Sequence, residues 1–299
     1  MNPTELCTEG PALSPVVAGT WRMADWGWTP QQRLAWIEQC IDLGVTSFDH
    51  ADLYGGYAVE SLFGEALELA PGLRERMQIV TKCGIKLVSP QRPTHRIKSY
   101  DCSREHIVQS VENSLQALGT DRIDLLLIHR PDLLLDAGEV ALTIGELKRT
   151  GKVLHFGVSN FTPAQFELLD SRTRLATNQI ELHPLHLAPL HDGTLDQAQR
   201  LQRRPMIWSP LAGGRLIGGD DSEAAQRVRG VLGSVAARLG CSPATLAYAW
   251  LLRHPARPVP VAGTRRIEAL KEALAALTLP IDAETWYEIW QAGSGHEVA

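Results

Sequence analysis

The pattern of hydrophobic and polar positions switches repeatedly between two periods along the chain. Short apolar runs alternate with longer stretches in which apolar residues recur every three or four positions, as on one face of a helix. The short runs predict strands at Val16–Gly19, Ser47–Asp49, Gln78–Lys82, Asp124–His129, His155–Ser159, Thr177–Glu181, Met206–Ser209 and Val259–Ala262. The longer stretches predict helices near Gln31–Leu43, Val59–Leu69, Arg104–Leu118, Glu139–Arg149, Ala164–Ser171, Thr194–Arg203, Ala244–Arg253 and Ile267–Ala276.

The strand that includes Ile123–Ile128 is apolar on successive rather than alternate residues. Both of its faces must therefore be covered, as in a parallel sheet flanked by helices. Ser/Thr-Pro pairs predict capped helix starts at Thr29, Thr162 and Ser242, and glycines predict left-handed helix ends at Gly44, Gly119 and Gly151.

The alternation of strands and helices continues along the chain without a linker-like change of composition. Two extra helices, near Glu223–Leu239 and Ala283–Trp290, are the additions to this plan. Repeated strand–helix units of this kind predict an α/β fold, a single-domain (β/α)8 TIM barrel that spans residues 1–299.

Composition and charge restrict the possible partners. Of the 299 residues, 44% are hydrophobic and 21% are charged, which is typical of a soluble globular protein. The net charge of −5 and the lack of a basic cluster argue against nucleic acid as a partner. The five cysteines are scattered, which argues against a zinc site or a disulfide framework. No signal peptide or membrane-spanning run is evident, so we expect a cytoplasmic protein that does not bind a membrane.

Four polar residues follow the predicted strands in a way that indicates a common site. Asp49, Lys82 and His129 end three strands, and Tyr54 follows Asp49 by one loop. Each of them alone would more often be a structural residue. In a barrel, however, the downstream ends of the strands meet at one rim, where active sites lie.

These four side chains suit the reduction of a carbonyl group, which needs a hydride at carbon and a proton at oxygen. Tyr54 could donate the proton, and the ammonium of Lys82 would stabilise its phenolate and make it a better donor. Asp49 could hold Lys82 in place, while His129 could orient the carbonyl oxygen.

Longer motifs around these residues match the landmarks of a known family in order. They are Phe48-Asp49-His50-Ala51 with Tyr54-Gly55, Thr81-Lys82, Leu127-Ile128-His129, Gly157-Val158-Ser159-Asn160-Phe161, Asn178-Gln179 and Trp208-Ser209-Pro210-Leu211. The chain resembles the aldo-keto reductases, over about residues 19–272, and most resembles their short bacterial members. The resemblance implies NADP(H)-dependent reduction of aldehydes or ketones, with the catalytic residues Asp49, Tyr54, Lys82 and His129.

The resemblance also implies a set of cofactor-binding residues. Ser159, Asn160 and Gln179 would bind the nicotinamide carboxamide, Trp208 would stack on the ring, and Arg265 and Arg266 would meet the 2′-phosphate. The full set is Gly19, Thr20, Trp21, Asp49, Ser159, Asn160, Gln179, Trp208, Ser209, Pro210, Leu211, Ala212, Gly213, Arg215, Gly263, Thr264, Arg265, Arg266 and Glu272. Ala273 departs from the family pattern, because many members carry an asparagine there that bonds the adenine.

The substrate side of the site is less constrained by the sequence. Trp21, Trp26, Tyr54 and His129 are the candidate substrate residues, although the tryptophans could equally be packing residues. His183 and His186 have a spacing that could suit a metal, but no third ligand is evident, so we interpret them as loop residues and expect no metal.

Alternative functions remain open at this point. The chain could be a nucleotide-sensing regulatory subunit that resembles the potassium-channel β-subunits, or a barrel enzyme without redox chemistry. For the reductase, we expect a small-molecule carbonyl substrate and a monomer or weak oligomer.

Overall fold

The computed structural model describes residues 2–219 and 222–299. Its eight parallel strands form a closed barrel in the order β10-β11-β12-β3-β4-β5-β8-β9. The barrel strands are β3 (Val17–Gly19), β4 (Ser47–Asp49), β5 (Gln78–Cys83), β8 (Ile123–Ile128), β9 (Val153–Ser159), β10 (Asn178–Glu181), β11 (Met206–Trp208) and β12 (Val259–Ala262). The predicted (β/α)8 TIM barrel is confirmed.

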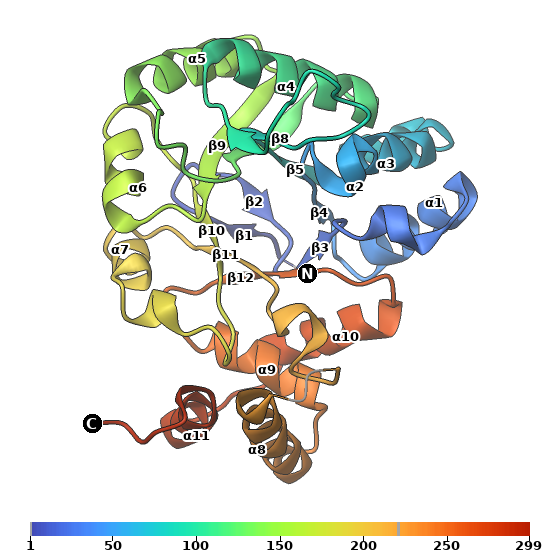
Figure 1. Cartoon of the computed structure of the whole chain (residues 1–299). Helices are drawn as coiled ribbons and strands as arrows, with labels where there is room; N and C mark the ends of the chain where they lie inside the picture. Colours follow the sequence, from blue (N-terminus) through green and yellow to red (C-terminus); the bar gives the residue numbers. More distant parts are fainter. Residues whose placement is uncertain (1, 220–221) are drawn as a thin grey trace. The chain divides into compact units, whose positions relative to one another are not determined.

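The chain divides into two compact units, Met1–Asn178 and Gln179–Ala299, and each is described by itself. The single-domain assignment stays a prediction. In the first unit, helices follow the strands in sequence and lie outside them (Figure 1). They are α1 (Pro30–Asp42), α2 (Tyr54–Tyr57), α3 (Val59–Glu68), α4 (Arg104–Leu118), α5 (Ala137–Arg149) and α6 (Pro163–Asp170).

Local signals in the sequence fix where these helices begin and end. Thr29 and Thr162 each form a capping box with the glutamine three residues later, which satisfies backbone N–H groups of the first turn. Gly44, Gly119 and Gly151 have positive φ, as the sequence predicts for the residue that follows a helix.

One glycine in β9 lets the strands of the first unit approach closely. A Cβ atom at Gly157 would lie 2.8 Å from the Thr177 carbonyl oxygen and 2.9 Å from Cδ2 of Leu127. No larger side chain fits there without a shift of backbone. Parallel pairing places Lys82 opposite Leu127, and Asp49 opposite Val80, so the polar strand ends lie on adjacent strands.

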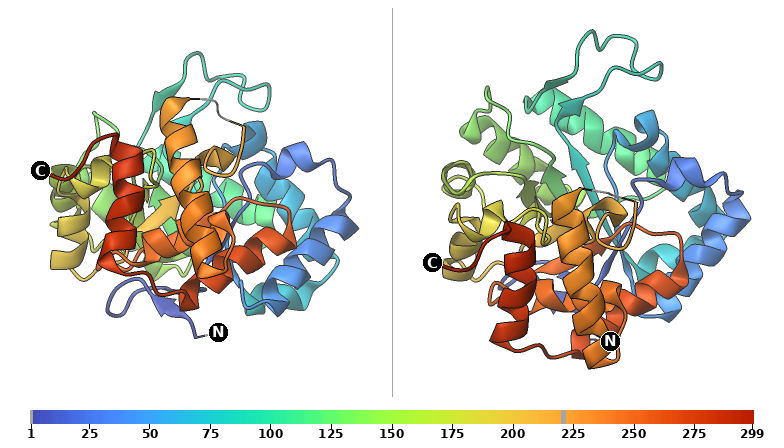
Figure 2. Two further views of the ribbon diagram at one scale, coloured as in Figure 1. Left: turned by 90° about the horizontal axis from the view of Figure 1, so that it is seen from below. Right: turned by 60° about the horizontal axis from the view of Figure 1, so that its bottom comes forward.

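Among its described residues, the second unit contains most of β10, the strands β11 and β12, and the α-helices that follow them in the chain. These are α7 (Thr194–Arg200), α8 (Glu223–Leu239), α9 (Pro243–Leu252), α10 (Ile267–Ala275) and α11 (Ala283–Ser294). The two helices added to the barrel plan, α8 and α11, pack side by side (Figures 1 and 2). Trp250 and Trp286 stack at 5.1 Å, and each indole N–H donates to the other's carbonyl oxygen at 3.1 Å. In the described ranges, no helix is long and apolar enough to cross a membrane.

Several short elements were not predicted. Two small hairpins, β1 (Thr4–Glu5) with β2 (Ala12–Leu13) and β6 (Ile85–Lys86) with β7 (Ser99–Tyr100), are too short to show a period. After β4, residues 54–57 form the turn α2 rather than an open loop. Strand bounds differ from the prediction by only a few residues: β8 ends one residue before His129, and β11 ends before Ser209.

Candidate active site

A buried ion pair lies at the downstream end of two adjacent strands. The ammonium of Lys82, on β5, donates to Oδ2 of Asp49, on β4, at 2.7 Å, and to the carbonyl oxygen of His50 at 2.7 Å. The side chain of Lys82 is only 1% exposed. Burial alone would lower the pKa of Lys82, but Asp49 and the neighbouring Tyr54 outweigh it, so the pKa is raised and the ammonium stays charged.

Tyr54 completes this group from the turn after β4. Its hydroxyl lies 3.2 Å from Nζ of Lys82, which also lies 5.1 Å from the centre of the phenol ring. Burial raises the pKa of Tyr54, and this effect outweighs the opposing effect of Lys82. The ammonium therefore acts in the direction that the sequence analysis expects, but the net shift is upward. The phenol keeps its proton at neutral pH and has it available to give.

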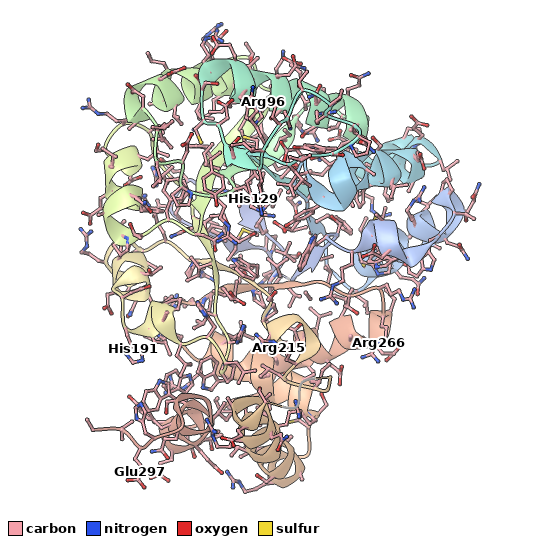
Figure 3. The ribbon with its side chains drawn as sticks, in the orientation of Figure 1. Arg96, His129, His191, Arg215, Arg266 and Glu297 are labelled. Atoms are coloured by element: carbon pink, nitrogen blue, oxygen red, sulfur yellow. The ribbon has the colours of Figure 1, made fainter. Side chains whose placement is uncertain are left out.

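His129 (Figure 3) directly follows the last residue of β8, and its ring lies beside that of Tyr54. The two rings meet edge to face, with centres 5.9 Å apart. Burial, followed by the positive charges of Lys82, Arg130 and Lys98, lowers the pKa of His129 well below its ordinary value. The imidazole is therefore neutral at physiological pH. Within the described residues its Nδ1 is buried without a hydrogen-bond partner, whereas a neutral ring usually uses both nitrogens.

Behind Lys82, on the outer side of β5, lie two buried acids that the sequence analysis did not single out. Glu60, on α3, accepts hydrogen bonds from Thr81 at 2.5 Å and from Ser114 at 2.8 Å. Burial raises the pKa of Glu60 to about 7. Burial and the nearby Glu60 raise the pKa of Asp52 well above its ordinary value. Glu60 gave no sequence signal beyond an acidic residue in a helical stretch, which usually means a solvated face, and Asp52 lay in a predicted loop.

The residues after β3 divide between the interior and the surface. Thr20 is fully buried, and its hydroxyl donates to the carbonyl oxygen of Asp49 at 2.9 Å. Trp21 is 57% exposed, and its ring centre lies 6.4 Å from that of Tyr54. Trp26 packs instead against Trp28 and Trp36, at 4.8 and 5.0 Å. Of the candidate substrate tryptophans, Trp21 is therefore the one beside the phenol.

Ser159 and Asn160 lie at the end of β9. Asn160 has a φ of 61°, and its amide nitrogen donates to Oγ of Ser159 at 2.8 Å and to the carbonyl oxygen of His129 at 3.4 Å. A non-glycine residue in the left-handed region is uncommon and is often found at functional sites. These contacts connect the predicted carboxamide-binding residues to the strand end that carries His129.

In the second unit, the segment after β11 has unusual backbone geometry. Ser209, Ala212, Gly213 and Gly214 have φ values of 50°, 54°, 69° and 106°. Backbone N–H groups of a turn can form a concave site that suits an anion. Arg215 follows (Figure 3). Its Nε donates to the carbonyl oxygen of Ala212 at 3.0 Å. Gln179 lies next to β11, with its amide nitrogen 3.9 Å from the sulfur of Met206.

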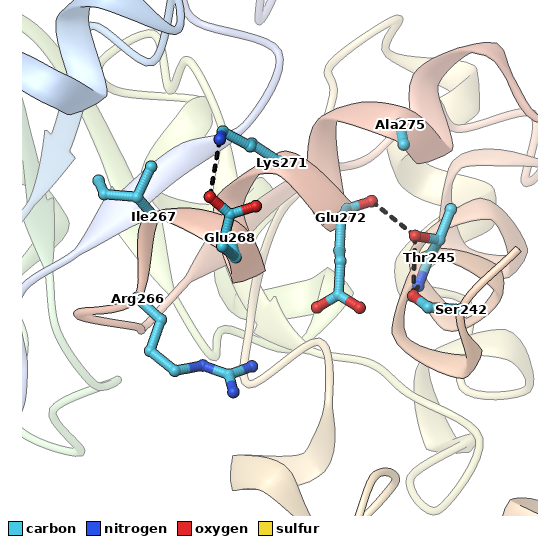
Figure 4. A pocket seen from close by; sticks show the side chains of 8 residues that line it. All are labelled: Ser242, Thr245, Arg266, Ile267, Glu268, Lys271, Glu272 and Ala275. Carbon is cyan, nitrogen blue, oxygen red and sulfur yellow. Dashed lines mark hydrogen bonds and ion pairs between the residues drawn. The ribbon is translucent and has the colours of Figure 1, made fainter.

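A pocket of about 760 Å³ lies between the start of α9 and α10. Arg266 and Glu272 point into it, and Ser242 and Thr245 form its opposite wall (Figure 4). Arg266 caps α10 through its backbone and is exposed, as Arg265 is, while Thr264 accepts a hydrogen bond from the Arg266 N–H at 3.1 Å. Arg266 and Glu272 also line an adjacent pocket of about 410 Å³ with Arg229 and Ile217. Ala273, the departure from the family pattern, is fully buried in α10.

The two histidines after β10 form a turn. Nε2 of His183 lies 3.0 Å from Glu181, and its Nδ1 accepts the Leu185 N–H at 3.1 Å. Burial lowers the pKa of His183 to about 4 despite the carboxylate. No group of three or more candidate metal-ligating side chains occurs in the described part of the chain.

Comparison with known proteins gives a consistent result. The model of the Aldo/keto reductase family matches residues 15–293. Oxidoreductase YdhF of Escherichia coli (strain K12) is 50% identical over 296 residues, covering 98% of each chain. A 6-dehydroglucose reductase of Agrobacterium fabrum is 44% identical over 290 residues, covering 96% of each chain. The crystal structure of a thermostable aldo-keto reductase with the inhibitor epalrestat is similar with a TM-score of 0.79 and 26% identity, covering 98% of this chain and 100% of that one.

Proposed function

Because this chain belongs to the aldo/keto reductase family and its curated relatives are oxidoreductases, we propose that it is an NADPH-dependent reductase of small carbonyl compounds, in which Tyr54 donates the proton. The observation that carries the proposal is the contact of the Tyr54 hydroxyl with the buried ammonium of Lys82, at 3.2 Å. Lys82 is in turn fixed by Asp49 at 2.7 Å.

The four side chains divide the work of proton transfer. As hydride reaches the carbonyl carbon, negative charge develops on the oxygen. A neutral His129 can donate a hydrogen bond to that oxygen, and the phenol of Tyr54 gives up its proton. The charged Lys82 then stabilises the phenolate that is left behind, and Asp49 keeps the ammonium oriented.

The nicotinamide cofactor would supply the hydride. Ser159, Asn160 and Gln179 have the amide and hydroxyl groups to bind a carboxamide, and Trp208 offers a planar indole for stacking. The left-handed backbone after β11 suits the pyrophosphate. Two exposed arginines at the start of α10 favour NADPH over NADH, since a helix N-terminus with guanidinium groups suits a 2′-phosphate.

The substrate class is suggested by relatives. Two of them are 6-dehydroglucose reductases, at 44% and 37% identity, so an oxidised sugar is a reasonable first substrate. The alternative is a nucleotide-sensing regulatory subunit with little turnover. The ion pair and the protonated phenol favour the enzyme, because sensing a nucleotide needs no proton donor.

The proposal is tested by measuring the rate of NADPH oxidation, from the loss of NADPH absorbance, with each member of a panel of aldehydes, ketones and oxidised sugars. We expect turnover with at least one carbonyl compound, and faster turnover with NADPH than with NADH. Tight NADPH binding without turnover would favour the regulatory subunit. A protein that binds neither cofactor would be a barrel enzyme without redox chemistry.

A further inference from the structure

The turn that carries Tyr54 has a strained backbone. Gly55, Gly56 and Tyr57 follow with φ values of 59°, 67° and 77°. Glycine adopts this left-handed conformation readily, but a bulky aromatic residue rarely does. Such a residue persists only where surrounding contacts over-determine the backbone, and such positions cluster at functional sites. The contacts made by Tyr57 therefore indicate what the turn is held against.

These contacts come from one segment, residues 87–95, which we term the clasp. The N–H of Leu87 donates to the hydroxyl of Tyr57 at 2.8 Å, and the hydroxyl also lies 3.4 Å from Nδ1 of His95. The guanidinium of Arg92 lies 4.6 Å from the centre of the Tyr57 ring. Ser89 adds a hydrogen bond to the carbonyl oxygen of Gly56 at 3.1 Å. The clasp belongs to the loop between β6 and β7, which projects from the first unit (Figure 2).

The geometry of the turn transmits this anchoring to Tyr54. The N–H of Tyr57 donates to the carbonyl oxygen of Leu53 at 3.2 Å, and the N–H of Ala58 donates to that of Tyr54 at 3.1 Å. The backbone of the turn is closely packed, because a Cβ atom at Gly55 would lie 2.8 Å from Cβ of Ala24. A change in the backbone of Tyr57 therefore shifts the residue whose hydroxyl lies 3.2 Å from Lys82.

We propose that Tyr57 is a positioning residue for proton transfer: its hydroxyl and ring fasten the Tyr54 turn to the clasp and so hold the Tyr54 phenol against Lys82. The inference rests on the proposed role of Tyr54 as proton donor. A misplaced donor slows the chemical step even where binding is intact, because proton transfer depends on hydrogen-bond geometry.

Replacement of Tyr57 by phenylalanine removes the hydroxyl and keeps the ring. With the carbonyl compound that the wild-type protein reduces fastest, we expect Tyr57→Phe to lower kcat about tenfold. The dissociation constant of NADPH should change less than twofold. The primary deuterium isotope effect from deuterated NADPH should increase as chemistry becomes rate-limiting. Tyr287→Phe is the matched control, since Tyr287 is 48% exposed on α11, and it should leave all three quantities unchanged.

A double-mutant cycle separates positioning from general damage. In a Tyr54→Phe background, Tyr57→Phe should cause no further loss of the residual rate, because the donor that it positions is already absent. A kcat within twofold of wild type for Tyr57→Phe, or an equal loss in both backgrounds, would overturn the proposal. If Tyr57→Phe does not fold, Ser89→Ala takes its place in the same cycle, with an expected loss of about threefold and the same criteria.

Failure of this inference can be told apart from failure of the proposed function. If Tyr54→Phe is inactive and Tyr57→Phe is as active as wild type, the reductase stands and the positioning role falls. If Tyr54→Phe is as active as wild type, the proton donor is misassigned, and the positioning role falls with it.

Discussion

The first unit contains a largely buried ion pair near each end of its strands, and the two pairs differ in how many of their neighbouring polar atoms have hydrogen-bond partners. Near the upstream ends, Arg74 donates to Asp124 at 2.7 Å, and its other N–H groups bond Thr120, Met77 and Arg122 at 2.8 to 3.1 Å. At the downstream ends, Lys82 and Asp49 meet at the same distance of 2.7 Å. Around that second pair, polar atoms of His50, Asp52 and His129 are buried without a hydrogen-bond partner in the described structure.

We interpret this difference as one between a pair that serves stability and a pair whose proposed role is in proton transfer. Unsatisfied buried polar atoms cost free energy, so a fold retains them mainly where they have a use. Hydrogen bonds within the protein occupy four of the five N–H groups of Arg74, which leaves this guanidinium little capacity for a ligand. In the other pair, the ammonium of Lys82 contacts the phenol of Tyr54, and the neutral imidazole of His129 lies nearby. A reacting carbonyl oxygen could form hydrogen bonds with this phenol and this imidazole.

Lys82→Met should have the largest effect, because it breaks the Lys82–Asp49 ion pair at the downstream ends of the strands. Loss of the ammonium removes the stabilisation of the Tyr54 phenolate, so we expect turnover to fall at least about a hundredfold. It also removes the cationic partner of the buried Asp49 carboxylate, at a cost of about 3–5 kcal/mol in the free energy of unfolding. Steady-state rates and denaturant unfolding of the same preparation measure both effects. A variant that keeps full activity would contradict the comparison.

Arg74→Met should break the ion pair at the upstream ends of the strands, and we expect it to lower stability while it leaves turnover nearly unchanged. We expect the free energy of unfolding to fall by about 3–5 kcal/mol, since the Asp124 carboxylate loses its buried partner. The turnover per folded molecule, measured well below the unfolding temperature, should stay within about twofold of wild type, because Arg74 contacts no candidate catalytic residue. A large loss of turnover with normal stability would show that this end is not merely structural.

Replacing both Arg265 and Arg266 by alanine extends the test to the proposed 2′-phosphate site in the second unit. Charge-assisted hydrogen bonds to a phosphate are worth about 1.5–3 kcal/mol, so we expect NADPH to bind about ten- to a hundredfold more weakly. NADH lacks the 2′-phosphate and should bind within about twofold of its wild-type affinity. Titration of both cofactors, with Arg257→Ala as a control, decides the matter. Equal losses for both would remove the proposed phosphate site.

Trp208→Ala should have the smallest effect of the set. Aromatic stacking contributes about 0.5–1.5 kcal/mol beyond burial, so the affinity for NADPH should fall several-fold. Binding of NADPH to the wild-type protein should quench tryptophan fluorescence, and the variant should lose most of that quench. If the quench persists in full, another tryptophan faces the cofactor.

Most of the fold could be predicted because long apolar patterns and helix caps record it directly. The caps at Thr29 and Thr162 and the left-handed Gly119 illustrate this, since at these positions the residue type itself begins or ends the helix. The short hairpins could not be predicted, because two-residue strands have no period.

The candidate site likewise has features that the sequence predicted and features that it did not. Strand ends placed Asp49, Lys82 and His129 on neighbouring strands, since parallel strands bring their downstream ends together. The positive φ of Tyr57 and the raised pKa of Glu60 had no comparable signal, because the first depends on contacts with the β6–β7 loop and the second on burial. The upward shift of the Tyr54 pKa likewise depends on burial, which local sequence does not reveal.

Reduction of a carbonyl compound by Tyr54→Phe tests the central claim most directly, because phenylalanine keeps the ring and loses only the proton. The claim predicts a rate about 10²–10⁴-fold below that of wild type, with unchanged NADPH affinity and with the free energy of unfolding within about 1 kcal/mol. Equal rates for the variant and the wild-type protein would contradict it.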